Sequence, residues 1–154
     1  MEHYYLLQRA RRPRRALQIG APLPWAEAAR RPLALLGAEM HNRAILDGVF
    51  DELGQHVTPA LETNSVLALL VAAQAGGVCA VLPGALVSTV AAEGALEALP
   101  LTAPEVRTPI GFLTASAARP SRALEAALIL AEDADWLAHA RAHTGALVPR
   151  VFPG

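Results

Sequence analysis

ETNSVLALLVAAQAGGVCAVLP, residues 62–83, is almost entirely apolar, yet it begins with four polar residues and is broken by a glycine pair. A membrane-spanning helix needs about 18 or more uninterrupted apolar residues. Gln74, Gly76 and Gly77 divide this stretch into one run of about ten residues and one of five. The stretch is therefore not a membrane helix, and its two runs must be interpreted separately.

The first run, 66–75, has the length and composition of a helix, and Asn64 or Ser65 is placed to cap its first turn. The second run, 78–82, has the length of a strand and ends at Pro83. Both runs are apolar on every side, as in sheets of parallel strands with helices on both faces. We therefore expect a buried helix followed by a buried strand.

Length and composition favour one compact domain, because 154 residues with 53% hydrophobic content can bury most of their surface. The chain does not open with the charged, apolar and small-residue segments of a secretion signal, so we expect a cytoplasmic protein. Cys79 is the only cysteine, which excludes an internal disulfide, and its apolar surroundings favour an unreactive thiol.

Positive charge is concentrated near the start of the chain. Residues 1–31 contain seven arginines against Glu2 and Glu27, a net charge of +5, so the remainder carries −6. Five of the arginines lie in RARRPRR, 9–15, which could contact phosphate or an acidic partner. A solvated loop is the alternative, because Pro13 interrupts any helix and no aromatic residue is interleaved to stack on bases.

Elsewhere, strand and helix patterns alternate along the chain. Strands are expected at 3–8, 32–37, 57–61, 96–101 and 108–115, and helices at 25–30, 41–53 and 121–143. This alternation predicts an α/β fold in which right-handed crossovers bring the carboxyl ends of the strands to one edge. Ligands usually bind at such an edge, which here is expected to comprise 37–42, 62–65 and 83–85.

The strongest chemical feature at this edge is the polar start of the quoted stretch. Thr63, Asn64 and Ser65 lie where the free N–H groups of a helix start can bind a carboxylate, sulfate or phosphate. Simple capping of the helix is the alternative interpretation. Glu62 argues against a strongly anionic ligand unless its carboxylate points away.

Catalytic and cofactor motifs are missing from the sequence. It contains no glycine-rich nucleotide motif and no G-x-S-x-G, and no cysteine or serine has a recognisable neighbouring base. His139 and His143 have metal-ligand spacing, but Ala140 stands where the zinc-hydrolase pattern needs glutamate. We therefore expect no enzyme activity, no metal and no cofactor, with His41 the most interesting histidine at the proposed edge.

The order of these segments resembles the effector-binding domain of LysR-type transcriptional regulators over roughly residues 2–140. In that family a strand ending in an acidic residue leads to a polar helix start, an apolar helix, glycines and a strand closing in proline. The resemblance rests on LETNSVLALLVAAQAGGVCAVLPGAL (61–86), LEALPL (96–101), TPIGFLTA (108–115) and SRALEAALILA (121–131), together with RPLALLG (31–37).

The resemblance implies a type 2 periplasmic-binding-protein-like fold, with two α/β lobes, two crossover strands and an effector held between the lobes. A central mixed sheet flanked by helices would form one complete lobe, 9–107. Residues 1–8 and 108–144 would supply the crossovers and part of an incomplete second lobe, leaving 145–154 as a tail. The two crossovers predict that Tyr4 to Leu7 pairs antiparallel with Ile110 to Leu113.

The implied function is sensing of a small polar or anionic effector within a homo-oligomeric regulator. DNA would be bound only through a winged helix-turn-helix domain that this sequence lacks. The effector would contact Thr63, Asn64, Ser65, Met40 and His41. A neighbouring subunit would cover Ile45, Leu46, Val49, Phe50 and Leu53. The alternatives are an oligomerisation module without a ligand, and an enzyme on a periplasmic-binding-like fold.

Overall fold

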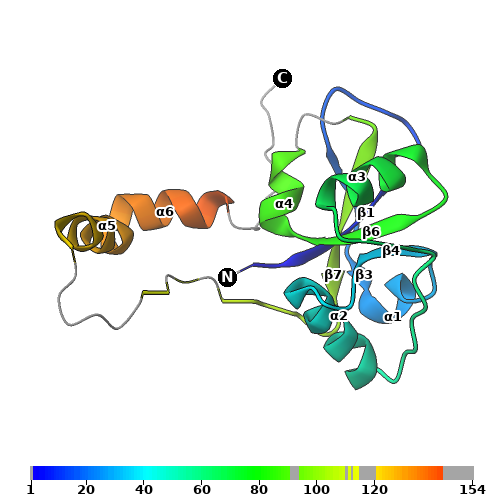
Figure 1. Cartoon of the computed structure of the whole chain (residues 1–154). Coiled ribbons are helices and arrows are strands. Elements are labelled where there is room, and N and C mark those ends of the chain that lie inside the picture. The colour runs from blue at the N-terminus through cyan, green and yellow to red at the C-terminus, as the bar shows by residue number, and fades with distance from the viewer. Residues whose placement is uncertain (1, 91–93, 110, 112, 115–120, 144–154) are drawn as a thin grey trace.

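The computed structural model of the chain describes residues 2–90, 94–109, 111, 113–114 and 121–143. Its centre is a mixed sheet of seven strands in the order β2-β7-β1-β6-β4-β5, with β3 also pairing with β7 (Figure 1). The strands are β1 (Tyr4–Arg9), β2 (Gln18–Ile19), β3 (Leu23–Pro24), β4 (Leu33–Leu36), β5 (Leu61–Thr63), β6 (Cys79–Pro83) and β7 (Leu96–Thr102). The helices are α1 (Trp25–Ala28), α2 (His41–Glu52), α3 (Val66–Ala75), α4 (Gly84–Thr89), α5 (Arg122–Glu132) and α6 (Ala134–His143).

The first strand of the chain lies in the middle of the sheet. β1 runs antiparallel to both of its neighbours, so that Tyr5 stands opposite Leu82 of β6 on one side and Pro100 of β7 on the other. β4, β5 and β6 are parallel to one another, and β2 and β3 are parallel to β7. The mixed α/β sheet flanked by helices is therefore confirmed.

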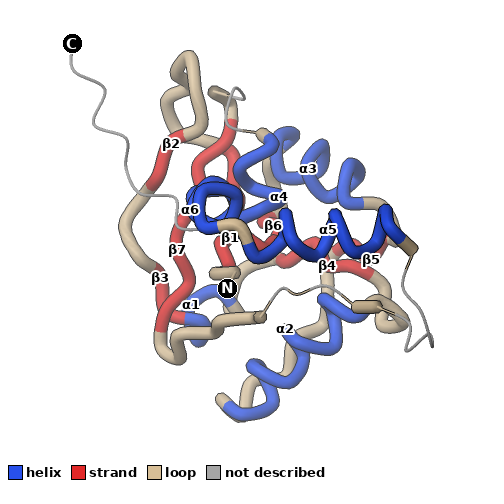
Figure 2. Tube along the Cα trace, turned by 90° about the vertical axis from the view of Figure 1, so that its left-hand side faces the viewer, coloured by secondary structure: helices blue, strands red, loops and turns tan. Residues whose placement is uncertain are grey.

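Alternate side chains of β1 supply two hydrophobic cores, as the period of two residues in a strand requires. Tyr4 and Leu6 face the core beneath α1 and α2, whereas Tyr5 and Leu7 face the core beneath α3 and α4. Figure 2 shows the two helix pairs on opposite faces of the sheet. This double coverage explains why the central strands are apolar on both faces.

An aromatic cluster fills the core beneath α1 and α2. The Trp25 ring centroid lies 6.0 Å from that of Tyr4 and 5.8 Å from that of Phe50, with an edge-on geometry to Phe50. Such tilted pairs stabilise beyond their buried area by about 0.5–1.5 kcal/mol. The cluster ties α1 and α2 to β1.

Residues 62–83 adopt the predicted helix and strand with one difference. α3 spans Val66–Ala75 and β6 spans Cys79–Pro83, as expected. The helix is not buried on every side, because only Leu69 and Ala73 are fully covered, while Leu67 and Val71 are 70% and 56% exposed. A helix on the outside of a single sheet has one face against that sheet, and no second layer covers the other face of α3 in the described part of the chain.

Other boundaries also differ from the prediction. β5 begins at Leu61 instead of residue 57, and Pro59, which lacks an N–H donor, lies in the loop before it. The predicted helix 121–143 is two helices, because Asp133 has an extended backbone and its Oδ1 accepts a hydrogen bond from the Trp136 N–H, which starts α6. α4 was missed because it is short and begins with Gly84.

The predicted pairing of Tyr4 to Leu7 with Ile110 to Leu113 is wrong. Both edges of this part of β1 are occupied by β6 and β7, and Ile110 lies outside the described residues. The observed antiparallel contact lies nearer the N-terminus, where Glu2 and Thr108 exchange backbone hydrogen bonds of 2.9 and 3.1 Å. The central sheet therefore includes the strand that we expected to be a crossover.

The final helices, α5 and α6, stand away from the sheet on the side where the chain begins (Figure 1). No residue of α5 is fully buried, and Ile129 and Leu130 on it are largely exposed. Leu124, Leu128 and Ala131, which share one face of α5, are half-buried. α5 therefore carries an apolar surface that the described part of the chain covers incompletely.

The glycine pair that breaks the quoted stretch generates a first prediction. Gly76 and Gly77 have φ angles of 85° and 90°, in the region that L side chains disfavour. We expect Gly77→Ala to lower the free energy of unfolding by about 1–2 kcal/mol, because its Cβ has open space and the cost comes from the backbone alone. Urea denaturation measures this difference.

Gly48→Ala is the matched control. Gly48 lies within α2, also has open space around an added Cβ, and has a helical backbone. The substitution should raise the free energy of unfolding by about 0.5–1 kcal/mol. Equal effects of the two substitutions would contradict our explanation of the glycine pair.

Candidate functional site

The carboxyl ends of β4 and β5 bring the predicted site segments together. Leu36 stands in register with Thr63, and the Gly37 N–H donates a 3.0 Å hydrogen bond to the Thr63 carbonyl oxygen. Met40 precedes α2 on the β4 side, and His41 is its first residue. The structure thus places the segments 37–42 and 62–65 side by side, as the rule for parallel strands predicts.

The polar residues before α3 divide between capping and exposure. The Ser65 Oγ accepts a 3.3 Å hydrogen bond from the Ala68 N–H, and the Thr63 Oγ1 accepts a 3.2 Å hydrogen bond from the Ser65 N–H. Capping is therefore real for these two side chains, although each hydroxyl retains its own proton to donate. Asn64 is exposed beside them. The first N–H groups of α3 have no carbonyl partner within the helix and concentrate positive potential there.

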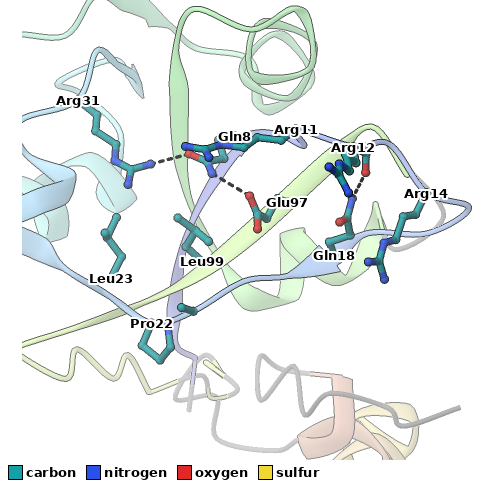
Figure 3. A pocket seen from close by; sticks show the side chains of 11 residues that line it. Gln8, Arg11, Arg12, Arg14, Gln18, Pro22, Leu23, Arg31, Glu97 and Leu99 are labelled. Carbon is teal, nitrogen blue, oxygen red and sulfur yellow. Dashed lines mark hydrogen bonds between the residues drawn. The ribbon is translucent and has the colours of Figure 1, made fainter.

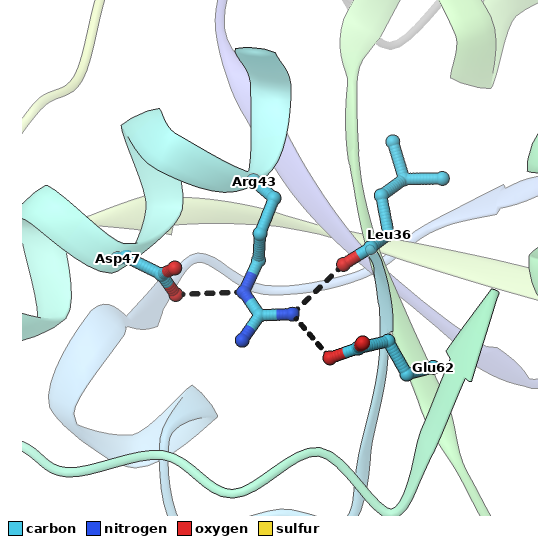
Figure 4. A network of polar contacts seen from close by, with 4 residues as sticks. All are labelled: Leu36, Arg43, Asp47 and Glu62. Atoms are coloured by element: carbon cyan, nitrogen blue, oxygen red, sulfur yellow. Dashed lines mark hydrogen bonds and ion pairs between the residues drawn. The ribbon is translucent and has the colours of Figure 1, made fainter. Parts of the chain in front are cut away.

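The carboxylate of Glu62 is turned toward a buried arginine. Arg43, which is 9% exposed, donates from Nε to Asp47 Oδ1 at 2.8 Å and from Nη1 to Glu62 Oε2 at 2.9 Å (Figure 4). Nη1 also donates to the Leu36 carbonyl oxygen at 2.8 Å. The negative charge that argued against an anionic ligand is therefore compensated within the chain.

Sequence reasoning missed Arg43. Burial alone would lower the pKa of Arg43, but the hydrogen bonds to Asp47 and Glu62 raise it, so the side chain remains a cation. Asp47 follows one helical turn later, which is a detectable local signal, whereas Glu62 lies on another strand. This arginine joins α2, the end of β4 and β5.

The two candidates next to β4 have different environments. Met40 is half-buried and packs against the core under α3, while His41 is exposed at the start of α2. Glu39 is also exposed, and its carboxylate occupies the space that a side chain on Gly37 would fill. An acceptor therefore accompanies the helix donors, which suits a ligand with both acidic and hydrogen-bond donor groups.

The start of β1 adds a second group of polar residues to this edge of the sheet. Tyr4 pairs with Pro83 at the end of β6, and its hydroxyl shares a 3.2 Å hydrogen bond with Thr108 Oγ1. Burial raises the pKa of Tyr4, and the hydrogen bond only partly offsets this, so the hydroxyl is neutral at pH 7. Local sequence carries no signal for this contact, because 104 residues separate the partners.

We expected the apolar stripe on α2 to be exposed in a single chain and covered by a neighbouring subunit. The expected exposure is wrong. Leu46, Val49 and Phe50 are buried within the core under α1 and α2, and Ile45 and Leu53 are half-buried against it. The stripe was expected to need a neighbouring subunit, but it covers one face of the chain's own sheet. The periodicity correctly identified a buried face without identifying its partner.

The remaining reactive groups offer little chemistry. Burial raises the pKa of the Cys79 thiol, although the adjacent Arg31 opposes this, so the unreactive neutral form is favoured at pH 7. The side chains of His139 and His143 lie outside the described residues. No helix in the described part of the chain has the length and apolar content needed to cross a bilayer.

Comparison with known families agrees with this geometry. A sequence model of the LysR substrate binding domain matches residues 3–135. The chain belongs to this family. LysR proteins are transcriptional regulators that bind DNA and form oligomers, and their substrate-binding domain has a periplasmic-binding-protein-like fold.

Solved structures share the fold of this LysR-family chain at low sequence identity. Full-length CbnR complexed with its target DNA matches with a TM-score of 0.52 and 18% identity, over 65% of this chain and 34% of that chain. CbnR, described as a LysR family transcriptional regulator, matches with a TM-score of 0.50 and 16% identity, over 67% and 35%. This chain thus spans about one third of the CbnR chains. No curated protein sequence matches it.

The buried arginine of this LysR-family chain yields a second prediction. Arg43→Met removes one cation and leaves the buried Leu36 carbonyl and Glu62 without a donor, so we expect the free energy of unfolding to fall by about 1–3 kcal/mol. Arg107→Met removes an exposed ion pair with Glu105 and should leave the free energy of unfolding almost unchanged. Chemical denaturation of both variants checks the difference, and equal losses would contradict a special role for Arg43.

Proposed function

We propose that this chain is the effector-sensing part of a LysR-type transcriptional regulator. The observation that carries the proposal is the meeting of the α3 start with the end of β4, beside a glutamate whose charge is compensated. This arrangement leaves the helix donors available to a small polar or anionic molecule.

The ligand chemistry follows from the groups at this edge. The first N–H groups of α3 and the Asn64 amide can donate to a carboxylate, and the Thr63 and Ser65 hydroxyls can donate while they cap the helix. Met40 offers an apolar contact, and the exposed His41 offers a polar contact. These residues are the effector contacts that we propose, with a small carboxylate as the preferred class.

The proposed mechanism is a shift between two arrangements of the lobes. Residues 4–107, which include β1, form one lobe, while 1–3 and 108–144 belong to the crossovers and the other lobe. The incompletely covered apolar surface of α5, at a distance from the sheet, supports this division. An effector held between lobes changes their equilibrium only if it binds one arrangement more tightly.

Regulation through this domain would require partners beyond the chain. DNA would be contacted through a winged helix-turn-helix domain outside this sequence, and homo-oligomers would transmit the lobe movement to it in the cytoplasm. An enzyme is the weaker alternative, since among the described residues no hydrogen bond joins a hydroxyl of the site to a carboxylate or an imidazole. A ligand-free oligomerisation module would leave the α3 start with its capping role alone.

The third prediction tests the effector contacts in a full-length regulator containing this domain. Thr63→Val combined with Asn64→Ala removes two donors at the α3 start. We expect about 10- to 100-fold weaker binding of the small carboxylate that the regulator recognises, because hydrogen bonds to charged groups contribute about 1.5–3 kcal/mol. Isothermal titration calorimetry with acetate, succinate and larger carboxylates measures the change.

Two control variants separate binding from capping. Ser121→Ala removes the corresponding cap to Leu124 at the start of α5, outside the proposed site, and should lower stability without changing affinity. Thr58→Val alters an exposed threonine in the loop before β5 and should leave affinity unchanged. If the double variant folds normally and binds each carboxylate as the wild type does, Thr63 and Asn64 have no role in effector binding.

A further inference from the structure

A second concave site lies at the opposite end of the sheet from the proposed effector contacts. It is a cavity of about 620 Å³ near the end of β1, where Arg9 pairs with Leu96. Its polar lining includes Gln8, Arg11, Arg12, Arg14, Arg31 and Glu97 (Figure 3). Small-molecule sites usually have volumes of about 300–1,000 Å³.

The charges around this cavity are unbalanced. Four guanidinium groups line it against the single carboxylate of Glu97, so its local charge is +3. In the described part of the chain, no ion pair joins Arg11, Arg12, Arg14 or Arg31 to an acid. Like charges held this close repel one another, and a bound polyanion relieves that repulsion.

The arginine segment, residues 9–15, is held by hydrogen bonds to β2 and to the residues before β7. The Arg14 N–H donates to the Gly94 carbonyl oxygen at 2.9 Å, and Gln18 Nε2 donates to the Arg12 carbonyl oxygen at 2.9 Å. A side chain on Gly94 would collide with the Arg14 backbone, so this close approach requires glycine. Beyond the segment, the Gly20 N–H donates to Ala98. The charged side chains are therefore carried by a backbone that hydrogen bonds hold in place, which the solvated-loop interpretation did not include.

The floor of the cavity is an ordered chain of hydrogen bonds. The half-buried Arg31 donates from Nη1 to Gln8 Oε1, and Gln8 Nε2 donates to Glu97 Oε2 at 2.8 Å. These two partners fix the orientation of the amide. Glu97 retains lone pairs that can accept hydrogen bonds from hydroxyl groups, which arginine cannot do because it only donates.

We propose that this cavity binds a small phosphorylated sugar, free or as part of a nucleotide. The phosphate would contact Arg11, Arg12 and Arg14, whose planar guanidinium groups suit bidentate recognition of phosphate. The sugar hydroxyls would donate to Glu97 and accept from Gln8. The combination of a cationic rim and a carboxylate floor distinguishes this ligand class from inorganic phosphate and from neutral sugars.

Ribose 5-phosphate, inorganic phosphate and ribose test this chemistry on the 154-residue chain. We expect calorimetry at low ionic strength to show ribose 5-phosphate binding about ten-fold more tightly than inorganic phosphate, and no binding of ribose alone. ATP is the nucleotide probe and should compete with ribose 5-phosphate. Equal affinities for ribose 5-phosphate and inorganic phosphate would overturn the proposal, as would preferential binding of duplex DNA without any ribose 5-phosphate binding.

Matched charge changes locate the site. Arg11→Ala with Arg12→Ala should weaken ribose 5-phosphate binding at least about ten-fold. Arg15→Ala with Arg30→Ala removes the same charge from exposed residues outside the cavity lining, and should leave most of the affinity. Equal losses in the two double variants would show general charge attraction and contradict the proposed site.

Glu97→Gln tests the floor independently of the rim. Removing the carboxylate should strengthen inorganic phosphate binding and weaken discrimination in favour of ribose 5-phosphate, because a repulsive charge and a hydroxyl acceptor are lost together. Circular dichroism checks that each variant is folded. An unchanged ratio of the two affinities in Glu97→Gln would remove Glu97 from the proposed site.

Discussion

The fold depends on one strand that joins two otherwise separate groups of strands. β1 lies between β6 and β7, so it alone connects β6, β4 and β5 with β7, β2 and β3. Its residues Tyr4 to Leu7 are all buried, alternating between the two cores. The backbone hydrogen bonds and both hydrophobic cores are therefore interdependent, and the edge residues that form the candidate effector site are held in place by the same strand.

Local sequence signals identified the elements that have local causes. The extent of α3 follows from the Ser65 cap and the glycine pair, both within or next to the helix, so it could be predicted to the residue. The central position of β1 could not, because a strand pattern does not specify its neighbours. The stripe on α2 shows the same limit, since periodicity marks an apolar face but does not distinguish a sheet of the same chain from a second subunit.

The candidate site was predictable in outline. Carboxyl ends of parallel strands meet at one edge, and the ends of β4 and β5 lie side by side as this rule predicts. The polar contacts that join its parts were not predictable, because Arg43 reaches Glu62 across 19 residues and Tyr4 reaches Thr108 across 104. The fixed arginine segment at the far end of the sheet was likewise hidden, since its anchors lie on residues that follow it by up to about 80 positions.

Arg43 has a consequence for motion within the domain. One guanidinium group holds the end of β4, the first turns of α2 and the strand β5, so thermal displacement of any one of them strains bonds to the other two. These three pieces should fluctuate as one rigid body with a shared amplitude. If this rigid body rotates about Thr63, Glu52 at the other end of the 12-residue helix α2 therefore moves farther than residues close to Thr63.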